Sequence, residues 1–343
     1  MQQFIIEKNE AGQRLDKFLH KYLKEASHSF LCKMLRKKNI TLNNKKAEGK
    51  EPLKEGDCIR FYFSEETFLK FRGEEKSGHS SWLYSQNSDL TSEYQKACCS
   101  LKGIEIIYEN QDILLLNKPA GILSQKAGRM DVSLNEWLIG YLLKQGTLTD
   151  RQLDTFKPSV CNRLDRNTSG LVICGKSLRG SQKMGQLLRE RSVHKYYRTF
   201  VKGIIRKPAH VRGYLSKDRA QNKAIFKSAL KPEDREFDLV ETRYIPLAHY
   251  GEITYLEVEL ITGKPHQIRA HLSWLEHPVL GDFKYGDKAF NHSLSGFKPQ
   301  WQLLHAYRLE MPYLEEPFRE LSERVFLAPE PEYFQKVKLS TLE

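Results

Sequence analysis

Apolar side chains recur at helical spacing twice within the first forty residues. The first stripe runs over residues 15–23 and the second over residues 30–35, and Ser29 is a candidate cap for the second helix. Residues 40–42 and 58–63 have strand character, with a turn at 43–44 between them. The pattern predicts a small domain of two helices and a short sheet over residues 1–63.

The periodicity is lost between residues 64 and 103. Ser, Glu, Lys and Gly dominate this stretch, which is typical of a linker or an insertion. Its apolar run, Trp82-Leu83-Tyr84, either packs the linker down or contacts RNA or the larger domain.

Strand and helix patterns alternate from residue 104 onward. The strand patterns cover residues 104–108, 113–116, 171–174, 196–201 and 256–260, and the helical patterns cover 178–188 and 268–275. Residues 104–343 are therefore expected to form an α+β domain with a large mixed, mainly antiparallel sheet.

Composition narrows the class of protein. A chain of 343 residues with 40% hydrophobic residues can build two domains with substantial cores. Its mean hydropathy of −0.58 and the lack of a long apolar run argue against a membrane span. The first residues show neither the basic region nor the apolar stretch of a signal peptide, so we expect a cytoplasmic protein. We also expect it to be monomeric.

The charge is strongly positive and unevenly distributed. The formal net charge is +12, which favours a polyanionic partner, nucleic acid first, although a merely soluble basic protein has the same composition. Residues 1–63 carry fourteen Lys or Arg against eight Asp or Glu, so half of the excess lies in under a fifth of the chain.

The amino-terminal run resembles the RNA-binding domain first described in ribosomal small-subunit protein four. The matching features are Gly12-x-Arg14-Leu15-Asp16-x-Phe18-Leu19, the basic second helix, and Leu53-x-Glu55-Gly56-Asp57. The resemblance implies RNA contacts from Arg14, Lys33, Arg36 and Lys37. The alternative is that the helix residues form an ordinary solvated face.

Cysteine and histidine spacings do not indicate a metal site. The six cysteines follow no zinc spacing, and in a cytoplasmic protein buried thiols are the better interpretation. His266 and His271 are five residues apart and lack the Glu of a zincin helix, so both are interpreted as structural.

The most informative segment is Cys161-Asn162-Arg163-Leu164-Asp165-Arg166-Asn167-Thr168-Ser169-Gly170. The two flanking arginines favour the ionised form of Asp165. The Thr-Ser-Gly run suits a tight loop held by side-chain-to-backbone hydrogen bonds. Taken alone, however, an Arg-x-Asp-Arg run is better explained as a surface salt-bridge cluster.

This segment resembles the catalytic motif of RluA-type (RluC/RluD-like) pseudouridine synthases, which carry His-Arg-Leu-Asp-x-x-Thr-Ser-Gly. Further motifs of that family match in order: Asn117-Lys118-Pro119-Ala120-Gly121, the strand from Lys195 to Gly203, and Thr262-Gly263-Lys264-Pro265-His266-Gln267-Ile268-Arg269, extended by residues 277–286. The resemblance covers about residues 104–320. It implies the pseudouridine synthase fold, with a central active-site cleft.

The resemblance also implies roles for single residues. Asp165 is expected to be the catalytic aspartate, Tyr197 to contact the target base and Arg269 to pair with Asp165. Arg163 is expected to fill the space left by a flipped base, and Ile268 to pack against uracil. Lys118 and Arg166 are also expected to bind substrate. From their charge alone, these two residues and Lys195 and Lys264 are candidates to contact phosphate. Without the resemblance, the sequence indicates that Tyr197 is a core residue and that Arg269 is a charged residue on the surface of a helix.

The implied reaction isomerises uridine in RNA. The base leaves its stack, Asp165 acts as nucleophile or as base toward the ribose, and the uracil rejoins through C5, by a covalent or a glycal intermediate. No cofactor or metal is expected. Large-subunit ribosomal RNA is the first substrate we expect and transfer RNA the second.

Two positions depart from the family pattern. Asn162 and Gln125 stand where the family usually carries His, and neither side chain can titrate. The competing hypothesis is therefore a non-catalytic RNA-binding or ribosome-assembly protein on a degenerate synthase scaffold.

Overall fold

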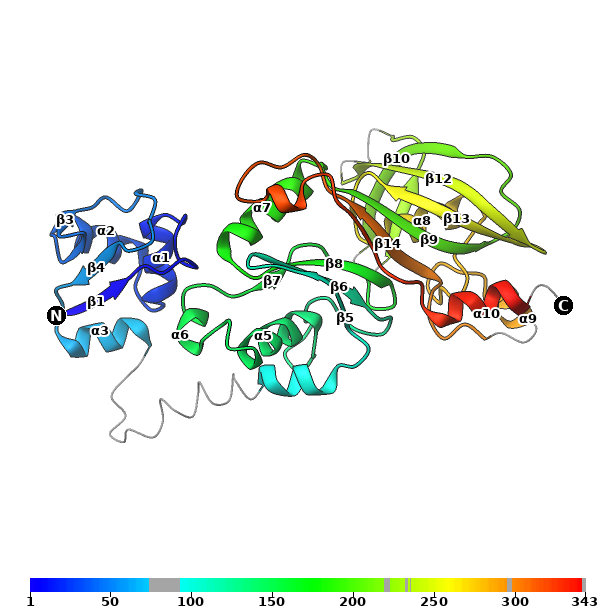
Figure 1. Cartoon of the computed structure of the whole chain (residues 1–343). Helices are drawn as coiled ribbons and strands as arrows, with labels where there is room; N and C mark the ends of the chain where they lie inside the picture. Colours follow the sequence, from blue (N-terminus) through cyan, green and yellow to red (C-terminus); the bar gives the residue numbers. More distant parts are fainter. Residues whose placement is uncertain (74–92, 219–222, 232–233, 235, 295–297, 341–343) are drawn as a thin grey trace.

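The computed structural model describes residues 1–343 except 74–92, 219–222, 232–233, 235, 295–297 and 341–343 (Figure 1). The described strands form two sheets, one of four strands near the amino terminus and one of eleven strands in the rest of the chain.

The small sheet has the order β1-β4-β2-β3 and is antiparallel throughout. Its strands are β1 (Gln2–Ile5), β2 (Ile40–Leu42), β3 (Lys45–Lys46) and β4 (Cys58–Phe61). Helices α1 (Leu15–Tyr22) and α2 (His28–Arg36) pack their apolar stripes against it in a single core cluster. The backbone N–H of Phe30 donates to the side chain of Ser27, so the cap of α2 is Ser27 and not Ser29 as predicted.

The segment predicted as a linker contributes to both domains. Helix α3 (Glu65–Arg72) buries Phe68 in the core of the small domain, which therefore extends beyond residue 63. Residues 93–100 are helical, and Tyr94 lies in a core cluster of the large domain. The predicted contact of Trp82-Leu83-Tyr84 lies outside the described residues.

The large sheet follows the order β11-β10-β12-β13-β9-β14-β8-β6-β5, with β15 beside β14 and β7 beside β8. Its bounds are β5 (Glu105–Glu109), β6 (Ile113–Lys118), β7 (Ser159–Val160), β8 (Ser169–Gly175), β9 (His194–Lys202), β10 (Ala209–Asp218), β11 (Lys223–Lys227), β12 (Asp238–Tyr250), β13 (Ile253–Leu260), β14 (Leu304–Glu310) and β15 (Val325–Leu327). Among the strand pairs that the structure describes, only β8 with β14 is parallel. The expected mixed, mainly antiparallel sheet is thus present.

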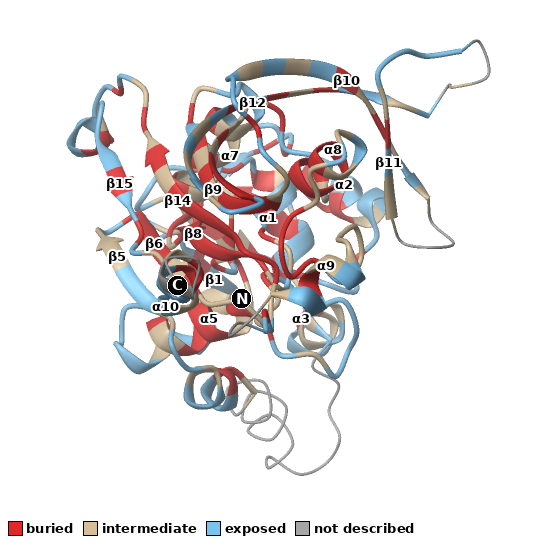
Figure 2. Cartoon of the chain, turned by 90° about the vertical axis from the view of Figure 1, so that its right-hand side faces the viewer, coloured by how far each residue is buried: buried red, intermediate tan, exposed pale blue. Residues whose placement is uncertain are grey.

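Both faces of the β6–β8 region are covered, which explains the unbroken apolar run at residues 113–116. Leu114 and Leu116 lie in the cluster that includes α5 (Leu134–Lys144), whereas Ile113 and Leu115 face α7 (Leu178–Arg189). Figure 2 shows β8, β9 and β14 as mostly buried and the edge strands β5 and β11 as mostly intermediate or exposed.

The loops that carry the predicted chemistry meet near the middle of this sheet. Residues 161–168 connect β7 to β8, and residues 261–266 connect β13 to α8 (Gln267–Trp274). Strand β9 pairs with both β13 and β14, and β14 pairs with β8, so β9 lies between the strands that carry the two loops. Three further short helices, α6 (Asp150–Leu153), α9 (Lys288–Ser293) and α10 (Glu332–Ser340), lie around the domain (Figure 1).

The segment around α6 contacts the small domain. Asp154 accepts from Lys24 at 2.9 Å and from Arg72 at 3.1 Å. The Thr155 hydroxyl donates to the Glu10 carboxylate at 2.7 Å. Polar contacts therefore connect the two domains at this point.

The cysteines are free, but not all of them are buried as expected. Cys32 and Cys99 are exposed and Cys174 is buried. Cys32 lies on α2 outside the stripe of core residues Leu31, Met34 and Leu35, and its thiol is exposed. In the part of the chain that the structure describes, no helix is long and apolar enough to span a bilayer.

A stability prediction follows from the parallel pair of strands. Gly170 has a φ of +115°, and a Cβ there would lie 2.2 Å from the carbonyl oxygen of Ala306 on β14. Gly146 also has a positive φ, +71°, but faces open space. We expect Gly170→Ala to lower the free energy of unfolding by more than about 3 kcal/mol, and Gly146→Ala to lower it by about 1 kcal/mol. Urea titration of both variants measures the difference, and equal losses would contradict the close approach of the strands.

Candidate active site

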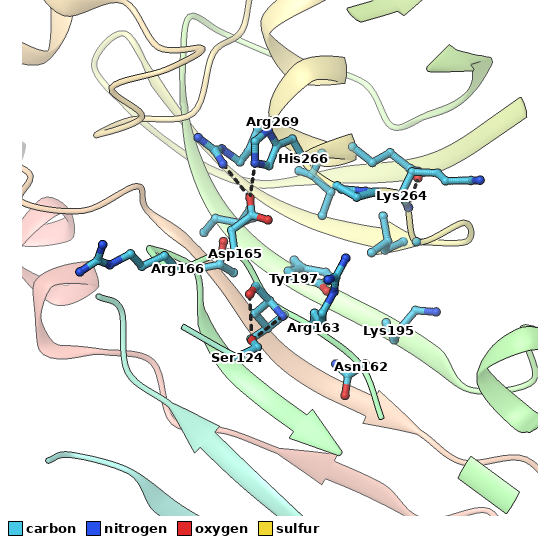
Figure 3. A pocket seen from close by; sticks show the side chains of 18 of the residues that line it. Ser124, Asn162, Arg163, Asp165, Arg166, Lys195, Tyr197, Lys264, His266 and Arg269 are labelled. Carbon is cyan, nitrogen blue, oxygen red and sulfur yellow. Dashed lines mark hydrogen bonds and ion pairs between the residues drawn. The ribbon is translucent and has the colours of Figure 1, made fainter. Parts of the chain in front are cut away.

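A cleft of about 850 Å³ opens between the 161–168 loop, strand β9 and the β13–α8 connection (Figure 3). Its lining includes eight Lys or Arg residues, and Asp165 is its single acidic residue. The cleft therefore holds one carboxylate in a strongly positive setting, which suits a polyanionic substrate.

The ion-pair partners of Asp165 come from α8 and the residue before it, and not from its neighbours in the sequence. Its Oδ2 lies 2.6 Å from Nη1 of Arg269 and 3.9 Å from Nε2 of His266 (Figure 3). Arg166 instead donates from Nε to the carbonyl oxygen of Gly121 at 3.1 Å. The expected pairing of Arg269 with Asp165 is thus present, whereas the flanking arginines do not supply it.

Asp282 holds Arg269 from the other side. The guanidinium donates from Nε and Nη2 to the two oxygens of Asp282, at 2.6 and 2.9 Å. Burial alone would raise the pKa of Asp282, but the hydrogen bonds and charge of Arg269, with two backbone N–H donors, leave that pKa below its usual value. Burial would likewise lower the pKa of Arg269, and the two carboxylates more than reverse this. Arg269 therefore stays protonated and fixed in direction.

Tyr197 and Ile268 form apolar surface beside the carboxylate. Both side chains are buried and both line the cleft. Burial, and next the charge of Asp165, raise the pKa of the Tyr197 phenol above its usual value, so the ring stays neutral. A planar base entering the cleft would meet this apolar surface next to the Asp165 carboxyl group.

The Asp165 loop is held by groups from outside it. The Ser124 hydroxyl donates to the carbonyl oxygen of Leu164 at 2.9 Å and accepts from the Leu164 N–H at 3.0 Å. The Gly121 N–H donates to the carbonyl oxygen of Arg166, and Gln302 donates to the Thr168 hydroxyl. Sequence reasoning gave no role to Ser124, Gln302 or Asp282. The only signal was that Ser124 and Asp282 are in or next to motifs that matched.

Lys118 does not line the cleft, contrary to its prediction as a substrate-binding residue. Its side chain is fully buried, and its ammonium donates to the carbonyl oxygens of Pro119, Ile122 and Arg166 at 2.9, 2.9 and 3.1 Å. Burial lowers the pKa of Lys118 to about 7, against the opposing effect of Asp165. Lys118 thus connects the turn at residues 119–122 with the 161–168 loop that carries Asp165, and its ammonium is not exposed in the cleft.

The two departures from the family pattern lie in different environments. Asn162 accepts from the Ile173 N–H at 2.7 Å and donates to the carbonyl oxygen of Leu171 at 3.4 Å, so its amide anchors the loop to β8. Gln125 is exposed at the rim of the cleft.

The two histidines near α8 also differ. His266, taken as structural from the sequence, lines the cleft, and its Nδ1 lies 2.8 Å from the Tyr285 hydroxyl. His271 is buried against the Phe226 ring, and burial lowers its pKa to about 4. Among the described residues, no group of three His, Cys, Asp or Glu side chains could hold a metal ion.

The predicted RNA contacts fall into two regions. Arg163 is exposed and lines the cleft with Arg166. Lys33 and Arg36 are exposed on α2 of the small domain, Lys37 is exposed directly after it, and none of the three lines the cleft. Arg14 pairs with Asp16 at 2.5 Å, which neutralises part of its charge.

Comparison with known proteins gives concordant matches. A family model described as RNA pseudouridylate synthase matches residues 112–274. Ribosomal large subunit pseudouridine synthase C of Vibrio cholerae is 28% identical over 316 residues, covering 90% of this chain and 88% of that protein. Ribosomal large subunit pseudouridine synthase D of Borreliella burgdorferi is 30% identical over 218 residues, covering 63% of each. The structure of human RNA pseudouridylate synthase domain containing 4 has a similar fold, with a TM-score of 0.55, 19% identity, and coverage of 76% of this chain and 98% of that one.

Replacing Asp282 by Asn should destabilise the site helix. The change leaves Arg269 buried with one carboxylate fewer, so we expect a loss of about 3–5 kcal/mol in the free energy of unfolding. Because the folded-state pKa of Asp282 lies below the unfolded value, its contribution is present above about pH 4 and is lost as the pH falls through the folded value.

Denaturant titrations between about pH 7 and 3 measure both effects, and the decline at acid pH should be shallower in Asp282→Asn than in the wild type. The matched control is Asp238→Asn, which removes an exposed partner of Lys264. It should cost less than about 1 kcal/mol. Similar losses in the two variants would contradict the dependence of Arg269 on its buried partner.

Proposed function

Because the chain belongs to the RNA pseudouridylate synthase family, we propose that it isomerises specific uridines in RNA with Asp165 as the catalytic carboxylate. The observation that supports this most directly is the pairing of Asp165 with Arg269 inside the cleft, at 2.6 Å, beside the buried Tyr197 ring. An ionised carboxylate held in one direction next to a flat apolar surface is suited to react with the nucleoside of a base that has left its stack.

Base flipping is the first step of the proposed mechanism. A uridine in folded RNA must leave its stack before its glycosidic bond is accessible, at a cost of a few kcal/mol. Arg163 is exposed at the cleft, and its planar cation can stack in the space that the base vacates.

Asp165 then breaks the bond between N1 and C1′, either as a nucleophile or as a base toward the ribose. Both routes use the carboxylate of Asp165, and the Arg269 guanidinium holds one of its oxygens in place at 2.6 Å. The uracil rotates and forms a bond from C5 to C1′. The C5 hydrogen leaves as a proton and N1 takes one up, so the reaction conserves all atoms and needs no oxidant or reductant.

Tyr197 and Ile268 hold the detached uracil during its rotation. The Tyr197 phenol remains neutral because burial raises its pKa, so it offers a ring surface and a hydroxyl and adds no second negative charge near Asp165. Ile268 supplies an apolar wall from α8. The base can therefore turn without leaving the cleft.

Ribosomal RNA of the large subunit is the substrate we propose first. The relatives from Vibrio cholerae and Borreliella burgdorferi are named for that subunit. The net charge of +12 and the exposed cations of α2 suit a large structured RNA. Mapping pseudouridines in total RNA from cells with and without the gene distinguishes ribosomal from transfer RNA.

Asp165→Asn should abolish turnover and leave RNA binding intact. The substitution keeps the shape of the side chain and removes its charge, so we expect turnover to fall by about 10⁴-fold or more. Tritium release from C5-labelled transcript measures turnover, and filter binding of the same transcript measures affinity. Retained turnover would rule out Asp165 as the catalytic group. A wild-type protein that binds natural RNA but never converts it would instead support a non-catalytic role on a synthase scaffold.

The basic face of α2 should contribute to RNA affinity through phosphate contacts. We expect replacement of Lys33, Arg36 and Lys37 together by Gln to lower the slope of log affinity against log salt by about 2 to 3, because each lost phosphate contact lowers it by about 0.7–0.9. The full-length protein is used, since α3 belongs to the same core as α2. A triple replacement of the exposed Lys144, Lys207 and Lys336 controls for net charge. Equal slopes for the two triple variants would show that α2 is an ordinary solvated face.

A further inference from the structure

The cations that line the cleft divide into two groups. One group has partners within the protein: Lys264 pairs with Asp238 at 2.6 Å, Arg269 with two carboxylates, Lys126 with Glu93 and Arg166 with the carbonyl oxygen of Gly121. Lys284 also belongs to this group, because it interacts with other residues of the chain. The other group consists of Arg163, Arg191 and Lys195, for which the described residues supply no carboxylate within ion-pair distance. The positive charge of the second group is therefore available to a ligand.

Lys195 is the most unusual member of this group. It is only 9% exposed, yet it lines the cleft. Burial, and then the nearby Arg191, lower its pKa. A cation that has lost most of its water and gained no counter-charge is in an unfavourable state, which an incoming anion would relieve.

The position of Lys195 relative to Tyr197 is fixed by strand geometry. The two residues are i and i+2 on β9, so their side chains leave the same face of the sheet, about 7 Å apart. In Figure 3, Lys195 lies on the side of the pocket away from Asp165 and Arg269. A base stacked near Tyr197 would thus place a neighbouring part of its strand near the Lys195 ammonium.

Arg191 approaches the same end of the cleft from α7. It follows the C-cap residue of the helix, and its φ of +59° is the left-handed conformation in which helices commonly end. The Ser192 N–H donates to the carbonyl oxygen of Leu187 at 2.9 Å and holds this turn in place. The charge of Arg191 acts on Lys195, so the two cations lie near each other, and Asp165 is the single acidic residue of the cleft lining.

We propose that Lys195 and Arg191 form a phosphate-binding subsite at the α7–β9 end of the cleft, which takes an RNA phosphodiester adjacent to the flipped uridine. The inference rests on the proposed function, because it uses the flipped base to define which phosphate is bound. A phosphodiester carries a full negative charge and can serve as the counter-charge for these two cations, whereas uracil carries no charge. Lys195 supplies a point charge and Arg191 a fork that can bind two phosphate oxygens.

The subsite should act on binding more than on chemistry. A phosphate contact is made equally in the bound substrate and in the transition state, so its loss raises KM and leaves kcat nearly unchanged. Removal of one charge-assisted contact should weaken binding about tenfold. It should also lower the slope of log affinity against log salt by about 0.7 for single-stranded RNA.

The test uses Lys195→Met, which keeps the aliphatic stem and removes the charge, with Lys195→Arg as the charge-preserving variant. Lys144→Met is the matched control, since Lys144 is exposed on α5 and lies outside the cleft lining. The probe is an unmodified transcript of large-subunit ribosomal RNA, with binding measured from about 50 to 200 mM salt. We expect the loss of slope in Lys195→Met, recovery in Lys195→Arg and no change in Lys144→Met. A slope in Lys195→Met equal to that of the wild type would overturn the subsite.

A chemical substitution in the RNA identifies the phosphate. Single methylphosphonate linkages on either side of the modified uridine remove one phosphate charge at a time. At the contacted linkage the wild type should lose about tenfold or more in affinity, and Lys195→Met should lose less, because one of the two cations of the subsite is already gone. Additive losses at both linkages would overturn the proposal, as would a fall in kcat at unchanged KM. If Lys195→Met fails to fold, Arg191→Met is subjected to the same two measurements.

The outcomes separate this inference from the proposed function. A wild-type protein that does not convert RNA refutes the synthase activity, while the salt slopes still decide whether Lys195 binds phosphate. Conversely, normal turnover with unchanged KM and slope in Lys195→Met removes the subsite and leaves Asp165 in its role.

Discussion

The active-site arrangement depends on one buried guanidinium. Arg269 binds Asp282 through two nitrogens and Asp165 through the third, so a single planar group joins α8, the segment between α8 and α9, and the β7–β8 loop. A lysine could not replace it, because an ammonium is a point charge and cannot hold two carboxylates on separate edges. The buried carboxylate offsets the cost of burying the cation, and the more exposed carboxylate remains available to a ligand.

This arrangement assigns different tasks to the two carboxylates that Arg269 binds. Asp282 is completely buried and accepts two backbone N–H groups besides the guanidinium, so all of its oxygen capacity is used within the protein. The Asp165 side chain is 24% exposed and faces the cleft. Lys118, Ser124 and Asn162 then fix the backbone around Asp165 through carbonyl and amide contacts. Asn162 can do this without a titratable group, so a histidine is not needed to shape the loop.

The sequence predicted the elements whose signal is local. The alternating or continuous apolar runs of β6, β8, β9 and β13 and the helical stripes of α1, α2 and α7 all correspond to observed elements. The motif order also brought Asp165, Tyr197 and Arg269 into a common site, as the structure has them. Lys118 was wrongly placed at the ligand because a lysine in a motif looks the same whether its ammonium meets carbonyls or phosphate. Asp282 and Ser124 were missed for the same reason, since their partners are more than ten residues away in the chain.

The partition of positive charge within the cleft has the same physical origin as the Arg269 arrangement. Where a cation must define the geometry of the protein, as Arg269 does, the fold supplies carboxylates or carbonyls that saturate it. Where the fold leaves a buried cation without a partner, as at Lys195, the free protein retains the energetic cost of burying that charge. A bound anion can remove this cost. Cations with partners in the protein thus give the site a fixed shape, and cations without such partners give it affinity for a polyanion. Because the two kinds of cation are identical in the sequence, only the positions of their partners in the folded chain distinguish them.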